Sequence, residues 1–142
     1  MSKLSFKDKH IDISHRKAYA LEAFLQACKE GEVAVTRKVV ESASADLGLQ
    51  SKSEILHFLT NGGIQDELTW VNSVAWKNNP NPSVQVMVDA YTFLSDHKRC
   101  YFAFMYFELT SSWMLKSLHV SEGSNSIMQA ALRKFLLQGE KS

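Results

Sequence analysis

The stretch from residue 91 to residue 120 constrains the fold more than any other part of the chain. Its side chains alternate with a period of two, and two short polar segments, residues 95–99 and 109–112, interrupt the alternation. A period of two is typical of β-strands, and short polar segments between strands are typical of hairpin turns. Together with a first strand over residues 84–93, the stretch therefore predicts a three-stranded antiparallel meander.

The three strands differ in which faces are apolar. Residues 100–108 are apolar on both faces, which is typical of a central strand that is covered on both sides, at least in part. The first strand has one apolar face, made of Val84, Val86, Val88 and Ala90. The alternation in the last strand predicts one face with Trp113, Leu115, Ser117 and His119, and another with Met114, Lys116, Leu118 and Val120.

Three segments before the meander have apolar residues at helical spacing, namely residues 15–31, 36–49 and 51–63. Thr36 can cap the start of the second helix, and Gly48 can end it. The third begins with the capping-box spacing Ser51-x-x-Glu54. A further helix, which would follow the meander, is predicted over residues 126–137.

The remaining segments have weaker patterns. Residues 64–77 fit both a helix and a strand, and we favour a strand from Leu68 onward. Residues 78–82 form a loop, and residues 1–14 are polar and aperiodic, which is typical of an N-terminal arm. The sequence therefore predicts one α+β domain over residues 1–142, with helices packed on one side of an antiparallel sheet.

The composition limits the classes of function. The formal net charge of +1 counts against extensive contact with phosphates but is compatible with a local basic patch. No apolar run approaches the ~20 residues that span a bilayer, and the N-terminus has no apolar signal region, so we expect a cytoplasmic protein without membrane contact. Cys28 and Cys100 fit no metal-ligand spacing, and we interpret them as small core residues.

No catalytic or metal-binding motif is recognisable in the sequence alone, so individual residues carry the chemistry. His119, at the end of a strand, is a candidate general acid or base, although such a histidine more commonly has only a structural role. The candidate cations are Arg37 near a helix start and Lys98, Arg99 and Lys116 in the meander, and some of them interleave with Tyr91, Tyr101 and Tyr106. Tyrosines beside cations on an open sheet suit RNA, because bases stack on rings while cations hold phosphates. Each residue by itself is more often a solvated surface or core residue.

Two stretches resemble the MqsR family of RelE-like ribonuclease toxins. In residues 30–59, the match consists of Gly31, Val33, Thr36 and Arg37 in G-x-V-x-x-T-R, and of Leu47-Gly48-Leu49 before an apolar helix. In residues 88–119, it consists of Asp89 and Tyr91 in D-x-Y, Tyr101 in V-Y-L and Ser117 in S-F-K. The motifs are short and only moderately specific.

The resemblance implies a RelE-like fold and an mRNA-cleaving toxin, a metal-independent endoribonuclease without a cofactor, that an antitoxin protein neutralises. It implies a catalytic role for Tyr101, and His119 stands where the family has its last lysine. The sequence departs from the family at Val88, which stands in place of a glutamine, and near residues 65–68, which contain no matching lysine. These departures weaken the inference of an enzyme more than the inference of the fold.

Two other classes of function remain open. A cystatin-like or NTF2-like α+β domain would bind a small apolar ligand or a partner chain in an aromatic concavity, lined by Trp70, Trp76, Phe93, Phe102 and Phe104. The other class is an interaction protein without a pocket, such as an inactive toxin relative or a homodimer that is joined through a sheet edge or the last helix. The discriminating feature is the surroundings of Tyr101 and His119, which are open and basic in a nuclease and enclosed and aromatic in a binding module.

Overall fold

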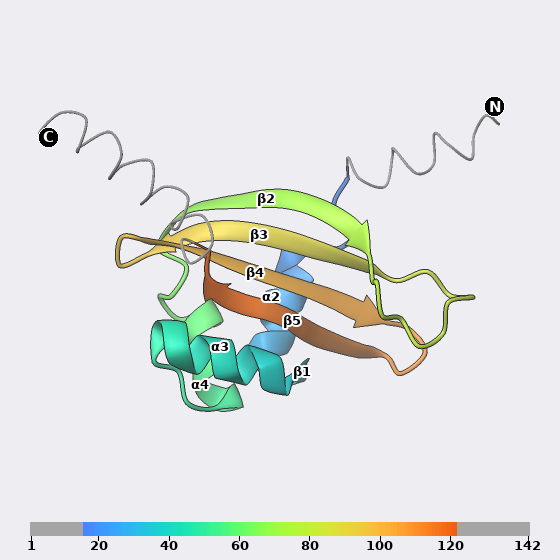
Figure 1. Ribbon diagram of the computed structural model, residues 1–142, viewed down its shortest axis with the longest axis horizontal. Helices are drawn as coiled ribbons and strands as arrows, with labels where there is room; N and C mark the ends of the chain where they lie inside the picture. The colour runs from blue at the N-terminus through green and yellow to red at the C-terminus, as the bar shows by residue number, and fades with distance from the viewer. Residues whose placement is uncertain (1–15, 122–142) are drawn as a thin grey trace, which may run out of the picture.

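The computed structural model describes residues 16–121. The predicted N-terminal arm over residues 1–14 and the predicted helix over residues 126–137 lie outside these residues. Within them the chain has the predicted α+β class, with three helices and one short strand before the four longer strands of the sheet (Figure 1).

Three helices and five strands make up the described fold. The helices are α2 (Leu21–Lys29), α3 (Arg37–Leu47) and α4 (Lys52–Thr60). The strands are β1 (Val33–Val35), β2 (Asp66–Ala75), β3 (Met87–Ser95), β4 (Lys98–Phe107) and β5 (Ser112–Val120). The sheet has the order β1-β5-β4-β3-β2, in which β1 is parallel to β5 and the other neighbours are antiparallel.

The predicted helix ends are confirmed where they depend on local hydrogen bonds. The side chain of Thr36 accepts a hydrogen bond from the backbone N–H of Val39, and that of Ser51 accepts one from Glu54. Both bonds satisfy amides that a helix start leaves without a partner. Gly48 ends α3 with a φ of 72°, a left-handed conformation that costs glycine little.

Helix α2 begins later than predicted because the chain before it binds to the sheet. The buried carboxylate of Asp89 on β3 accepts hydrogen bonds from the backbone amides of Ala18 and Tyr19, at 2.9–3.0 Å. The hydroxyl of Tyr19 donates a further bond of 2.7 Å to the carbonyl of Met87. These bonds anchor the segment before α2 to the sheet, and they compensate for the burial of the Asp89 charge.

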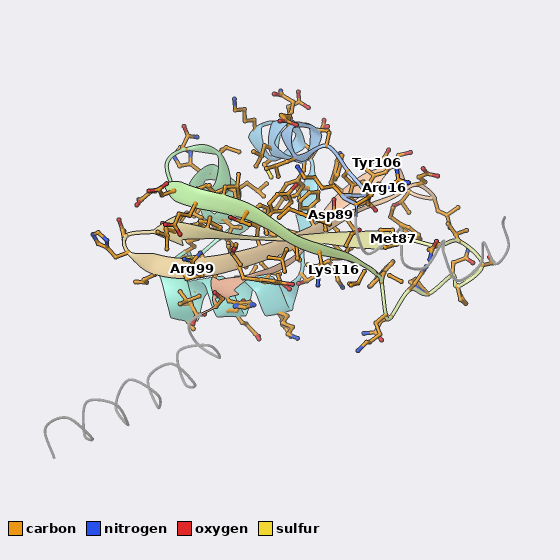
Figure 2. All side chains as sticks on the ribbon, turned by 90° about the horizontal axis from the view of Figure 1, so that it is seen from above. Arg16, Met87, Asp89, Arg99, Tyr106 and Lys116 are labelled. Carbon is orange, nitrogen blue, oxygen red and sulfur yellow. The ribbon has the colours of Figure 1, made fainter. Side chains whose placement is uncertain are left out.

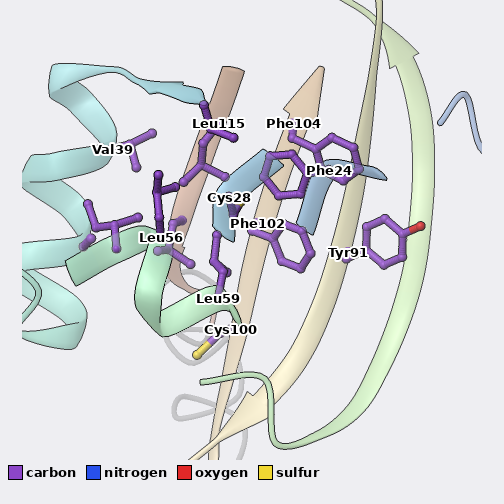
Figure 3. Close-up of a cluster of buried hydrophobic side chains, with 14 of the residues drawn as sticks. Phe24, Cys28, Val39, Leu56, Leu59, Tyr91, Cys100, Phe102, Phe104 and Leu115 are labelled. Atoms are coloured by element: carbon purple, nitrogen blue, oxygen red, sulfur yellow. The ribbon is translucent and has the colours of Figure 1, made fainter. Parts of the chain in front are cut away.

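The hydrophobic core lies between the sheet and the helices (Figure 3). Phe24 of α2 stacks on Phe104 of β4, with ring centroids 4.0 Å apart and planes 8° from parallel. Phe58 of α4 packs against Phe93 of β3. We call the side of the sheet that these residues occupy the inner face. Both cysteines are buried in the core, as predicted, and burial raises the pKa of Cys28 to about 12.

The meander is confirmed, with β4 in its centre. β4 pairs with β3 on one side and with β5 on the other, and it is a strand over its whole length. On the side away from α2 and α4, Ala103 and Met105 are also buried. The middle of β4 is therefore covered on both faces, as its apolar residues predict.

Two details of the strand assignments were wrong. β3 begins at Met87 rather than at residue 84, and its core residues are Tyr91 and Phe93 instead of the predicted row of small apolar residues. The aromatic rings face the core because α2 and α4 present aromatic partners there, and large rings gain the most from burial. Strand β1 was not predicted, since three residues are too short to show a periodicity.

Candidate functional site

Tyr101 and His119 lie side by side on the face of the sheet that is turned away from α2 and α4. We call this side the outer face. Tyr101 of β4 and His119 of β5 are direct cross-strand partners, and their rings stack with centroids 5.0 Å apart and planes 23° from parallel. Both side chains are half-buried. Burial raises the pKa of the Tyr101 phenol, so its hydroxyl stays protonated and can donate a hydrogen bond at neutral pH.

A cation stands next to this pair on the same strand. Arg99 precedes Tyr101 by two positions on β4, so the two side chains lie on the same face with Cα atoms about 7 Å apart. Its guanidinium forms an ion pair of 2.9 Å with Glu67 of β2, and both side chains are partly exposed to solvent. An ion pair in contact with water is weak, so the pair with Glu67 contributes little to stability.

Lys116 reaches the outer face because β5 contains a β-bulge. Ser117 pairs with Ala103 and Leu115 pairs with Phe104, which leaves Lys116 as the extra residue. Its ammonium lies 5.2 Å from the centre of the Trp76 ring, a cation–π contact. Figure 2 shows Lys116 and Arg99 on the side of the sheet opposite to Asp89.

The surroundings of Lys116 disfavour its charge. Burial and, to a lesser extent, the positive charge of Lys38 lower the pKa of its ammonium. Lys38 belongs to the first turn of α3, so a second cation stands near Lys116. An anion bound between these groups would offset their repulsion and favour the charged form of Lys116.

The bulge also corrects the predicted faces of β5. The alternation predicts that Trp113 and Leu115 share a face with Ser117 and His119. In the structure, Leu115 and Leu118 are both fully buried in the core, while Ser117 and His119 pair with outer-face residues of β4. The extra residue shifts the alternation by one, because a bulge places two residues opposite one.

The other predicted site residues lie elsewhere. Lys98 is the exposed first residue of β4 and lies two positions before Cys100, so the alternation of the strand places it on the inner-face side. Arg37 is the exposed first residue of α3. Tyr91 lies on the inner face, only 3% exposed, and its ring stacks on Phe102. Tyr91 therefore does not share a surface with Tyr101 and His119.

The five aromatic residues that a binding concavity would need do not come together. Phe93, Phe102 and Phe104 are fully buried inside the core. Trp76 packs edge-on against Phe107 on the outer face, whereas Trp70 packs against the core on the inner face. These residues fill the inner face and part of the outer face instead of lining one hollow.

Two surface cavities of about 540 Å³ each flank α4. One lies between α2 and α4 and is lined by Lys29, Ser51 and His57 among others. The second lies between α4 and the β3–β4 turn and shares His57 with the first. Both cavities open on the helical side, away from the outer face. The first cavity also contains Cys28, but burial raises the pKa of this thiol to about 12 and keeps it protonated. In the described contacts, Ser51 accepts the capping bond from Glu54 and His57 contacts Asn61, so neither forms a nucleophile–base pair, and we place the candidate site on the outer face.

Sequence reasoning missed the parts of the site that depend on bulges and on long-range pairing. Nothing in the sequence around Lys116 marks a bulge, and the ion pair between Glu67 and Arg99 joins residues far apart in the chain. The pairing of Tyr101 with His119 was accessible from the sequence, because the positions of the two polar turns fix the approximate register of the hairpins.

Residues 16–121 contain no group of three or more histidine, cysteine or acidic side chains that could hold a metal ion. None of the helices in this part of the chain is long and apolar enough to cross a membrane. Comparisons with protein families, with curated proteins and with solved structures found no match to this chain. A functional proposal therefore rests on the geometry of the outer face and on the chemistry of its residues.

Proposed function

We propose that the outer face of the sheet binds single-stranded RNA and that RNA is cleaved at the Tyr101–His119 pair. The observation that carries this proposal is the stacking of these two half-buried rings on the outer face, with Arg99 beside them. Aromatic rings and nearby cations on a sheet face suit single-stranded nucleic acids, because bases stack on the rings and phosphates bind the cations.

The charge of the chain fits a short contact with RNA. A net charge of +1 does not support a long phosphate track. The cations beside the outer face, Arg99, Lys116 and Lys38, would contact about three phosphates. We therefore expect a site of a few nucleotides, with weak binding that depends on stacking as much as on charge.

His119 and Tyr101 can have complementary roles in metal-independent cleavage of RNA. His119 takes the proton from the 2′-hydroxyl, whose oxygen attacks the adjacent phosphorus. The protonated Tyr101 hydroxyl donates a hydrogen bond to the phosphate, and a cation such as Arg99 stabilises its growing negative charge. The bond to the 5′-oxygen breaks, and this oxygen takes a proton from water. The products are a 2′,3′-cyclic phosphate and a 5′-hydroxyl.

The resemblance to the MqsR family adds a cellular role to this proposal. Members of that family are mRNA-cleaving toxins with an antitoxin partner, and Tyr101 stands where they have a catalytic tyrosine. A toxin role for this chain rests on that resemblance, while the cleavage chemistry rests on the residues of the outer face. The two parts of the proposal can therefore be tested separately.

The test of the chemistry is a cleavage assay with purified protein and a single-stranded RNA in the presence of a metal chelator. We expect cleavage products with a 2′,3′-cyclic phosphate, and a rate about 100-fold or more lower for His119→Ala, because a general base contributes at least that factor. His57→Ala is the matched control, since His57 is exposed on α4, away from the outer face. An inactive wild-type protein, or a His119→Ala variant with full activity, would refute the proposed chemistry.

A further inference from the structure

Strand β2 leaves one edge of the sheet uncovered in the described part of the chain. It is the last strand in the sheet order, and no described strand pairs with the edge that faces away from β3 (Figure 1). The opposite edge is protected in two ways. β1 pairs with the first part of β5, and α3 covers the rest. There the hydroxyl of Ser42 donates to the carbonyl of Leu118, and the carboxylate of Asp46 accepts from the amide of Val120.

The exposed apolar residues of the described chain gather on this uncovered strand. Four large hydrophobic side chains are exposed within residues 16–121, and three of them belong to β2. They are Leu68, Val71 and Val74, which are 40%, 45% and 48% exposed. Single exposed apolar residues are ordinary, but three of them on one free edge strand are typical of a strand that pairs with another chain.

The charges at the two ends of β2 indicate which kind of strand fits. Asp66 is exposed at the start of the strand, and Lys77 is exposed just after its end. A second β2 in the antiparallel direction would place the lysine of each copy close to the aspartate of the other. A parallel copy would place like charges together, which is unfavourable. The charge pattern therefore favours an antiparallel copy of the same strand.

We propose that β2 pairs antiparallel with β2 of a second copy of this chain, about a two-fold axis near Val71 and Asn72. This pairing extends the sheet across two molecules and places the neighbouring strand beside the three exposed apolar side chains. A two-fold axis makes each contact occur twice, as in most homodimers. The dimer surface is the edge of the sheet, so this proposal does not rest on RNA binding by the outer face.

The dimer is expected to be weak because β2 is irregular. Register shifts occur between Asp66 and Thr69 and between Trp70 and Asn72, where β2 pairs with β3. Bulges bend a strand and reduce the number of backbone hydrogen bonds that its free edge can form. A small interface of this kind supports a dissociation constant on the order of 10–100 μM.

Sedimentation equilibrium of the full chain over a range of concentrations tests the proposal. We expect a monomer–dimer equilibrium, which Val71→Lys weakens at least about tenfold because it buries two like charges at the axis. Leu109→Lys is the matched control. Leu109 is the fourth exposed large hydrophobic residue and follows β4 in a turn, so this variant should dimerise like the wild type. Circular dichroism of each variant verifies that the fold is intact.

A charge exchange tests the direction of pairing. Asp66→Lys or Lys77→Asp alone should weaken the dimer about tenfold, since each places two like pairs across the interface. The double variant should return to within about threefold of the wild type. A monomer at concentrations up to about 1 mM, equal effects of Val71→Lys and Leu109→Lys, or no recovery in the double variant would overturn the proposal.

Discussion

Replacement of Lys116 by glutamine should make RNA binding less sensitive to salt. The ammonium of Lys116 stands over Trp76 on the outer face, near the cation of Lys38. With Arg99, these residues would neutralise about three phosphates of a bound RNA. Each neutralised phosphate in a single strand contributes about −0.7 to the slope of log affinity against log salt. The wild-type slope should therefore be about −2, and that of Lys116→Gln about −1.4.

The difference is large enough to measure. Between 50 and 200 mM salt, a slope of −2.1 lowers the affinity about 18-fold and a slope of −1.4 lowers it about sevenfold. Fluorescence anisotropy with a labelled oligonucleotide whose 2′-hydroxyls are methylated measures the affinity without cleavage. The control is Lys29→Gln, which removes the same formal charge from the end of α2, away from the outer face.

The comparison of the two variants separates a local contact from a general effect of charge. If Lys116 contacts RNA, only its replacement changes the slope, and Lys29→Gln behaves like the wild type. Equal slopes for all three proteins, or equal changes in both variants, would refute the placement of phosphates beside Lys116.

Four further outcomes are expected. Glu67→Gln should tighten RNA binding, because it removes a negative charge beside the outer face, and should cost less than about 1 kcal/mol of stability in a denaturant titration. Burial and the neighbouring cation of Lys38 lower the pKa of Lys116, so its positive charge is lost at a lower pH than that of an ordinary lysine. RNA affinity of the wild type should therefore fall as the pH rises through this pKa. The affinity of Lys116→Gln should show no fall in that pH range. Expression of the chain without an antitoxin should arrest bacterial growth, His119→Ala should relieve the arrest, and a harmless wild type would argue against a toxin. Phe24→Ala should lower the free energy of unfolding by about 3–5 kcal/mol, because it empties a fully buried site against Phe104, and a loss below about 1 kcal/mol would contradict the described core.

The sequence predicted the parts of the fold that depend on local patterns. The capping side chains of Thr36 and Ser51 mark the starts of α3 and α4, and Gly48 marks the end of α3. The period of two and the polar turns define β4 with its two hairpins. These features are predictable because each depends on residues within a few positions of one another.

The remaining features depend on contacts between distant residues. Helix α2 starts late because the carboxylate of Asp89, which is distant in the sequence, accepts hydrogen bonds from the backbone amides of Ala18 and Tyr19. The core side of β3 is decided by the aromatic partners that the helices present. The bulge at Lys116 moves a cation to the outer face and separates Leu115 from His119. A prediction that assumes strict alternation cannot reveal a bulge. The residues that share the outer face with Tyr101 and His119 could therefore be identified only from the structure.

The most direct test of RNA binding by the outer face is a titration of the ¹⁵N-labelled protein with a methylated single-stranded oligonucleotide, followed by amide chemical shifts. Binding at the proposed site predicts the largest changes at Arg99, Tyr101 and His119, with changes near Lys116 that shrink as salt is added. The amides around His57, between the two cavities beside α4, should stay nearly unchanged. Changes concentrated on the helical side, or no change at millimolar oligonucleotide and low salt, would contradict the proposal that this face binds RNA.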